Sequence, residues 1–290
     1  MNNLSYVVDA CQVYAVEAAS GMCVLSRIVI AANGYADRVT VLQGDASHMQ
    51  LPGNILADVL ISEWMGFYLL HESMLDAVVA ARDRLLRPGA AMFPSTATLS
   101  ACPVALKEYC AHNFDFWNDV CGFDMSAVAS VARQKCLSSP EVITLPKNAL
   151  LAQPQQLLSI DLQYVNADDV STVMSSLEFV VTRNEVMHGF ALWFDVSFDG
   201  RSPVTLDTSP LSPPTHWQQT VVMFPDALLV NRDSVVQCRM LLQRAEVNRR
   251  QYNITVEMIE IDNDDDEDDD ESMNSVSTKQ MIKDAMNKVI

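Results

Sequence analysis

The sequence predicts a protein in two parts, an α/β unit over residues 1–94 and an antiparallel β domain over residues 95–261. Strand-like and helix-like segments alternate before Pro94, an order typical of a mostly parallel sheet with helices on its faces. After Pro94 the apolar residues increasingly alternate with a period of two, which is typical of antiparallel strands. The clearest case is Phe190–Phe198, in which every second residue is large and apolar.

Five segments of the α/β unit have the length and apolar spacing of regular elements. The expected strands are Val13–Glu17, Val39–Gln43 and Ala57–Ser62, and the expected helices are Met22–Asn33 and Glu72–Leu86. The second helix is expected to end at Arg87-Pro88-Gly89, because proline and glycine cannot continue it.

The β domain is expected to form a barrel-like structure. Besides Phe190–Phe198, its strand-like runs are Ser176–Thr182, Gln218–Phe224, Val235–Leu242 and Tyr252–Ile261. An inserted helical arm is expected at about residues 105–138, because Ala105–Lys135 is rich in helix formers and aromatics. Residues 262–290 are expected to be a disordered acidic tail, with a possible short amphipathic helix at Asn274–Ile290.

The charge balance is strongly acidic. The 37 acids and 19 bases give a net charge of −18, and nine of the acids lie within Asp262–Glu271. Because the rest of the chain is acidic as well, we expect basic partners and no direct contact with nucleic acid or anionic lipid. No apolar run approaches the length of a membrane helix.

Two residue types limit the chemistry further. The seven cysteines are widely spaced without a C-x-x-C motif, so we expect no disulfide framework and no metal site. This pattern indicates a soluble protein of a reducing compartment, the nucleus or the cytoplasm or both. The nine glycines never occur as G-x-G, so the chain has no glycine-rich cofactor loop.

The segment Ser62–Leu75 is the most unusual in the chain. It follows an apolar strand and precedes a helix, so it lies at the carboxyl end of a strand, where α/β sheets bind ligands. Glu63 and Glu72 flank an aromatic loop that carries no other acid or lysine. Two opposed carboxylates suit a planar guanidinium, which offers paired N–H groups. The alternative is that Glu72 is a helix first-turn acid and Glu63 a solvated strand-end acid.

The sequence of Ser62–Leu75, SEWMGFYLLHESML, resembles the double-glutamate loop of the protein arginine N-methyltransferases. Five other stretches agree with this family in order and spacing, so that the resemblance spans roughly residues 10–261. They are Val13–Ala18, Leu86–Ser95, Phe116–Met125, Met187–Phe198 and Ser209–Gln218, of which Met187–Phe198 is similar to the type I members.

The resemblance implies a Rossmann-like, S-adenosylmethionine-dependent methyltransferase domain, a β-barrel domain and a helical dimerisation arm. The implied activity is methyl transfer from S-adenosylmethionine to arginine guanidinium nitrogens in proteins, with asymmetric dimethylation favoured. The implied substrates are basic, arginine-containing segments such as histone tails and Arg-Gly-rich proteins. The arm implies a homodimer or a heterodimer.

The resemblance also implies roles for individual residues. Glu63 and Glu72 are expected to grip the substrate guanidinium and to direct a nitrogen lone pair at the methyl group. Glu17 is expected to bind the ribose hydroxyls of the cofactor, although it can also be a simple strand-end acid. Ala46 is compatible with a backbone contact to the adenine, and Ser47 stands where the family usually has a glutamate.

Four further residues are expected to line the substrate pocket. Met65 and Met74 are expected in the acceptor pocket, with ordinary core packing as the alternative. His216 and Trp217 are expected to wall the arginine channel. Packing against the β domain is the alternative for Trp217, and His216 lacks the acid on an N-terminal helix that it pairs with in the family.

Compared with the family pattern, the chain is expected to be N-terminally truncated, because the central strand with its Gly-x-Gly loop is missing. We therefore expect this chain alone to bind S-adenosylmethionine poorly. Two interpretations remain open: a truncated gene model of an active enzyme, and a catalytically inactive scaffold or regulatory subunit of an intact relative.

Overall fold

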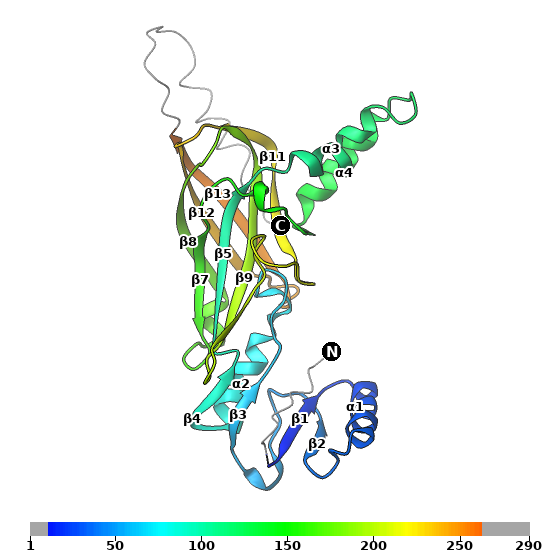
Figure 1. Cartoon of the computed structure of the whole chain (residues 1–290), viewed down its shortest axis with the longest axis vertical. Coiled ribbons are helices and arrows are strands. Elements are labelled where there is room, and N and C mark those ends of the chain that lie inside the picture. The colour runs from blue at the N-terminus through cyan, green and yellow to red at the C-terminus, as the bar shows by residue number, and fades with distance from the viewer. Residues whose placement is uncertain (1–10, 263–290) are drawn as a thin grey trace.

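The computed structural model describes residues 11–262. Figure 1 shows a mixed α/β part at one end of the molecule and a long antiparallel β part at the other. This order agrees with the sequence prediction. The acidic tract beyond Asp262 and the expected helix Asn274–Ile290 lie outside the described residues.

The α/β part consists of two parallel strand pairs, each with one α-helix, and of two short 3₁₀ helices. Strand β1 pairs with β2, and β3 pairs with β4. The strands are β1 (Val13–Glu17), β2 (Val39–Gln43), β3 (Ala57–Ile61) and β4 (Leu86–Phe93), and the helices are α1 (Ser20–Ala32), η1 (Pro52–Asn54), η2 (His71–Ser73) and α2 (Leu75–Leu85).

Two details of this part differ from the sequence prediction. Helix α2 begins at Leu75 and not at Glu72, because Glu72 and Ser73 have φ values of 73° and 53°, which an α-helix cannot contain. Helix α2 ends at Leu85, just before Arg87-Pro88-Gly89 as expected, and this segment lies inside strand β4. The two strand pairs are also separate two-stranded sheets in the described residues, where the sequence predicts one mostly parallel sheet.

The β part consists of two antiparallel sheets. The larger sheet has the strand order β6-β11-β9-β5-β7 with β10 beside β9, and the smaller one has the order β13-β12-β8. The strands are β5 (Thr96–Val104), β6 (Glu141–Ile143), β7 (Gln155–Asp161), β8 (Thr172–Val180), β9 (Glu185–Phe198), β10 (Val204–Asp207), β11 (Gln219–Val230), β12 (Val235–Arg244) and β13 (Tyr252–Asp262); short 3₁₀ helices lie at η4 (Lys147–Ala149) and η5 (Ala167–Val170).

The hydrogen bonding of these strands does not close into a barrel, which corrects that expectation. Strands β7 and β8 contact each other along one seam without a backbone ladder. There the Ser175 hydroxyl donates to the Leu157 carbonyl oxygen at 2.8 Å. The two sheets nevertheless enclose one core, which includes Leu99, Phe190 and Met240.

Strand β9 is buried on both faces over much of its length, whereas the sequence predicts one buried face. Trp193 lies on the face expected to point away from the core, yet it is only 4% exposed. Pro154 and Leu211 line the space around its indole ring, so connecting segments shield this face from water.

The inserted arm is helical, as expected for about residues 105–138. It lies between β5 and β6 and consists of α3 (Lys107–Asn113), η3 (Asp115–Asn118) and α4 (Ser126–Ser138). Figure 1 shows α3 and α4 projecting away from the sheets. Phe114 anchors the arm because it is buried, whereas Phe123 is 72% exposed.

The two parts meet at the beginning of α2. The Arg244 guanidinium at the end of β12 binds both carboxylate oxygens of Asp76, at 2.7 and 2.9 Å. The Arg244 side chain is only 7% exposed, and its Nε and Nη2 also donate to the Tyr252 hydroxyl. Trp64, Leu75 and Val79 belong to the same core as the sheets, so α2 and the loop before it are fixed to the β part.

We predict that Asp76→Ala destabilises the chain by about 2 kcal/mol, because it leaves the buried Arg244 charge without its carboxylate. Urea unfolding of the purified chain measures this change. The control is Glu257→Ala, which breaks a 2.9 Å pair with Arg239 whose side chains are 46% and 59% exposed. We expect that control to cost less than about 1 kcal/mol, and an equal cost for the two variants would contradict the prediction.

Candidate functional site

The candidate site is built on a tight hairpin after strand β3. Gly66 and Leu69 exchange two backbone hydrogen bonds of 3.0 Å and form the turn. Glu63 precedes Gly66 by three residues, and Glu72 follows Leu69 by three. The two acids therefore stand at equal sequence distances from the two ends of the turn.

The turn requires its glycine. A Cβ atom at Gly66 would collide with the backbone carbonyl of His71, so no larger residue fits without moving the chain. Four residues of this loop have positive φ: Tyr68, Leu69, Glu72 and Ser73. Left-handed backbone is costly for non-glycine residues, so the surrounding core must hold the loop in place. Trp64, Leu69 and Leu70 are buried in that core.

Each acid has one oxygen held by a fixed donor. Glu63 Oε1 accepts from the Met65 backbone N–H at 3.1 Å. Glu72 Oε2 lies 2.9 Å from Nη2 of Arg250. Among the described residues, no hydrogen bond or ion pair engages Oε2 of Glu63 or Oε1 of Glu72. The pair therefore presents one available carboxylate oxygen from each side of the hairpin.

The loop between β10 and β11 contributes the Thr-His-Trp segment. The Trp217 indole donates from Nε1 to the Met65 carbonyl oxygen at 2.8 Å, and His216 stacks on Trp217 with ring centroids 3.8 Å apart. Trp217 also packs edge-on against Phe194. The structure thus brings His216, Trp217 and the double-acid loop together. Met65 is buried, and Met74 packs against the main core, so the pocket roles of both stay predictions.

An aromatic pair supports the outer side of the loop. The Tyr68 hydroxyl and Nδ1 of His71 lie 3.0 Å apart. Burial raises the pKa of Tyr68 to about 12. Burial also lowers the pKa of His71, and this effect outweighs the nearby charge of Glu72, which raises it. At neutral pH both side chains are therefore uncharged, and His71 adds no positive charge beside Glu72.

The turn between β12 and β13 clamps the second half of the loop. The Glu72 N–H donates to the Arg250 carbonyl oxygen at 2.6 Å, and the Ser73 hydroxyl donates to the Arg249 carbonyl oxygen at 2.6 Å. Neither Arg249 nor Arg250 is among the site residues predicted from the sequence. Two adjacent arginines in a strongly acidic chain were the available signal.

The expected cofactor residues lie at the carboxyl ends of β1 and β2. The Gly44 N–H donates to the Glu17 carbonyl oxygen at 2.9 Å, so the two strand ends are neighbours. The half-buried Glu17 accepts a 2.8 Å bond from the Ala19 N–H. Ala46 and Ser47 are half-buried in the turn after β2. A carboxylate beside a backbone turn at this edge fits a ligand with vicinal hydroxyls.

The same turn is tied to helix α2. Arg84 donates to the carbonyl oxygens of Ser47 and His48. Hydrogen bonds from the Ser47 backbone lower the pKa of Asp45 and stabilise the turn. Because Arg84 is at one end of α2 and the double-acid loop is at the other, one short helix links the two groups of expected site residues.

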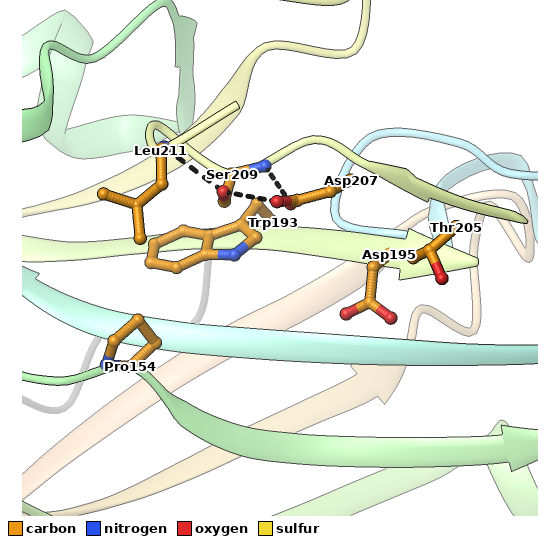
Figure 2. Close-up of a pocket in the computed structure, with 7 residues that line it drawn as sticks. All are labelled: Pro154, Trp193, Asp195, Thr205, Asp207, Ser209 and Leu211. Atoms are coloured by element: carbon orange, nitrogen blue, oxygen red, sulfur yellow. Dashed lines mark hydrogen bonds between the residues drawn. The ribbon is translucent and has the colours of Figure 1, made fainter. Parts of the chain in front are cut away.

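Figure 2 shows a separate pocket on strands β9 and β10, with a volume of about 260 Å³. Trp193, Asp195 and Asp207 are among its lining residues, and none of the expected site residues is. Asp207 accepts hydrogen bonds from Ser209 and Ser212. Burial and the charge of Asp207 raise the pKa of Asp195, for whose carboxylate no side-chain donor is found in residues 11–262.

The described residues contain neither a metal-ligand cluster nor a membrane-spanning helix. No group of three or more histidine, cysteine, aspartate or glutamate side chains in residues 11–262 is placed to hold a metal ion. No helix in this range is long and apolar enough to cross a bilayer.

Comparisons with known proteins agree with this architecture. Residues 95–260 match the arginine methyltransferase oligomerization subdomain. The chain is 36% identical over 281 residues to a probable protein arginine N-methyltransferase 6 of Arabidopsis thaliana, covering 85% of this chain and 64% of that protein. It is 35% identical over 246 residues to protein arginine N-methyltransferase 6 of Xenopus laevis, covering 83% of this chain and 71% of the relative.

A solved structure shares the fold. The chain superposes with a TM-score of 0.76 and 31% identity on a Trypanosoma brucei PRMT1 enzyme-prozyme heterotetrameric complex with AdoHcy, covering 86% of this chain and 76% of that one. The chain therefore belongs to the protein arginine N-methyltransferase family. It is homologous to S-adenosylmethionine-dependent enzymes, and it spans less than two thirds of the Arabidopsis relative.

We predict that Gly66→Ala destabilises the chain by about 1–3 kcal/mol, because the added methyl group overpacks the hairpin against a backbone carbonyl. Chemical denaturation measures the loss. The control is Gly21→Ala in helix α1, where a Cβ meets no atom within 4 Å. That variant is expected to be neutral or stabilising by up to about 1 kcal/mol, and a comparable loss in both would argue against the tight turn.

We predict that Asp195→Asn stabilises the chain at pH 7. A carboxyl whose pKa is raised by folding destabilises the native state above that pKa, and the penalty disappears below the unfolded value of about 3.9. Thermal unfolding should therefore show a gain at pH 7 that vanishes near pH 3. Asp207→Asn is the control, and it should lower the midpoint at pH 7 because three bonds from serines are weakened. A loss of stability in Asp195→Asn at pH 7 would contradict the assignment.

Proposed function

We propose that this chain is a protein-arginine N-methyltransferase that transfers a methyl group from S-adenosylmethionine to guanidinium nitrogens of arginine in proteins. The observation that carries the proposal is the pair Glu63 and Glu72, placed at equivalent positions around the Gly66–Leu69 turn with one available oxygen each. A guanidinium presents paired N–H donors in one plane, which suits two such acceptors.

The two acids act by holding and polarising the substrate. Arginine has a pKa above about 12, so its guanidinium enters the site charged. Two carboxylates draw the positive charge toward the nitrogens that they bind and leave the lone pair of a terminal nitrogen better able to attack. As the new N–C bond forms, the sulfonium S–C bond would break to leave a neutral thioether, and the methylated nitrogen would give up one N–H proton to a carboxylate of the pair. The step depends on in-line placement and exclusion of water. By its family motif Met187–Phe198 the enzyme is type I, forming asymmetric dimethylarginine, with Met65 and Met74 in the acceptor pocket.

S-adenosylmethionine supplies the sulfonium methyl group when it is bound. Glu17 would bind the ribose hydroxyls, and the turn with Ala46 and Ser47 would contact the adenine. Glu17 and this turn lie side by side at the ends of β1 and β2, which supports the assignment. The proposed chemistry uses no metal.

The proposed substrates are basic protein segments such as histone tails and Arg-Gly-rich proteins. The net charge of −18 attracts them over a distance, and salt weakens this attraction. His216 and Trp217 would wall the channel by which the arginine side chain enters, because Trp217 is bonded to the double-acid loop. All seven cysteines are free thiols, in keeping with a nuclear or cytoplasmic location.

We propose that the chain forms a homodimer or heterodimer through its arm. The arm presents Phe116, Phe123 and Val131 with 51%, 72% and 66% of their surface exposed. Helix α1 in turn exposes Leu25 and Ile28. Apolar side chains exposed on a projecting element and on a separate helix face are typical of association surfaces.

The test is methyl transfer from radiolabelled S-adenosylmethionine to a histone H4 tail peptide. Glu63→Gln and Glu72→Gln each keep the shape of the side chain and remove its charge, so we expect at least a roughly 100-fold loss of kcat/KM. The control is Glu246→Gln, which removes the same charge from an exposed position outside the double-acid loop. Transfer that is unchanged in Glu72→Gln would refute the proposed role.

A second candidate function is a non-catalytic subunit that activates an intact relative. The similar Trypanosoma brucei structure is an enzyme-prozyme complex, so members of this fold include assemblies of that kind. The separate strand pairs of the α/β part also favour it, because they provide no continuous sheet in the described residues. Under this hypothesis the chain alone transfers no methyl group. It raises the activity of an intact family member, and Glu72→Gln leaves that stimulation intact.

A further inference from the structure

We propose that Arg250 is a positioning residue for Glu72, which holds one oxygen of that carboxylate so that the other faces an incoming guanidinium. This inference rests on the proposed function of the Glu63–Glu72 pair. Arg250 lies in the turn between β12 and β13, far along the chain from the loop that it contacts.

Three contacts fix Glu72 relative to this turn. Its N–H donates to the Arg250 carbonyl oxygen at 2.6 Å, and its Oε2 lies 2.9 Å from the Arg250 guanidinium. The hydroxyl of the next residue, Ser73, binds the Arg249 carbonyl oxygen. Backbone and side chain of Glu72 are thus held by one residue, which restricts the rotation of the carboxylate.

The arrangement parallels that of Glu63. There the Met65 N–H occupies one oxygen, and the second oxygen has no partner in residues 11–262. In Glu72 the charged Arg250 side chain takes the place of that backbone donor. A side chain tied at one oxygen presents the other in a defined direction, which is what pre-organised binding of a planar ligand requires.

The charges agree with this role. Glu63 and Glu72 together carry two negative charges, whereas a substrate guanidinium brings one positive charge. Arg250 supplies the second positive charge. His71 does not supply it, because burial lowers its pKa and keeps it neutral. The neighbouring Arg249 is bound through its carbonyl group, and no contact of its guanidinium is found among the described residues.

A purely structural role explains the pair less well. The Arg250 side chain is 66% exposed and that of Glu72 is 40% exposed. Ion pairs with this exposure contribute little to stability. Arg250→Gln should therefore leave the unfolding midpoint nearly unchanged, and its effect should appear in recognition of the substrate.

The experiment measures binding of a histone H4 tail peptide to the full chain by isothermal titration, beside a peptide whose arginine is replaced by citrulline. We expect Arg250→Gln to weaken arginine-dependent binding about threefold to tenfold, the size of one lost charged contact. Arg250→Lys should restore part of the loss. Arg249→Gln is the matched control, because it removes the same charge from the same turn without touching Glu72.

A double-mutant cycle isolates the path through Glu72. If Arg250 acts by positioning that carboxylate, Arg250→Gln should have no further effect in a Glu72→Gln background. Equal effects in both backgrounds, equal losses in Arg249→Gln and Arg250→Gln, or a wild-type chain that does not distinguish arginine from citrulline would each overturn the proposal. So would tighter binding by Arg250→Gln, which would make Arg250 a competitor of the substrate.

Methyl transfer measured in parallel distinguishes a failure of the proposed catalytic function from a failure of the positioning role of Arg250. A chain that binds the arginine peptide through Arg250 and Glu72 but transfers no methyl group contradicts the proposed catalytic function and leaves the positioning role standing. A chain that is active and indifferent to Arg250→Gln contradicts only the positioning role.

Discussion

The structure depends on the contact between the β12–β13 turn and the residues that open helix α2. Arg244 binds Asp76 in a buried bidentate pair, while Arg249 and Arg250 bind the two residues with positive φ at the end of the double-acid loop. Left-handed backbone persists only where its surroundings fix it. The β part therefore fixes the second half of the double-acid loop, including Glu72, although that loop belongs to the other part.

The loop itself combines several local constraints. Gly66 permits the close approach of the His71 carbonyl, the Gly66–Leu69 turn sets the two acids at equivalent positions, and Trp217 holds the chain between them through Met65. In each of these interactions a residue of the motif fixes the shape of the loop. Within residues 11–262, each glutamate makes one hydrogen bond or ion pair through its side chain, which leaves one carboxylate oxygen of each for the proposed guanidinium contact.

Local pattern was enough to predict much of this protein. Strands Val13–Glu17 and Val39–Gln43 and the helical arm follow from apolar spacing and residue type. The pairing of Glu63 with Glu72 stays a prediction. Features that depend on contacts between distant parts of the chain could not be predicted from local pattern. The late start of α2 comes from backbone held by Arg249 and Arg250, the burial of Trp193 comes from distant loops, and the unclosed sheets reflect a seam that no strand pattern reveals.

The distance along the chain between Ser73 and Arg249, 176 residues, has a consequence for biosynthesis. The ribosome releases the double-acid loop first, and the turn that fixes it is made 176 residues later. Contacts of this sequence separation form late, after the entropy of closing a long loop has been overcome. A nascent polypeptide that still lacks the β12–β13 turn therefore cannot hold the double-acid loop in its final geometry.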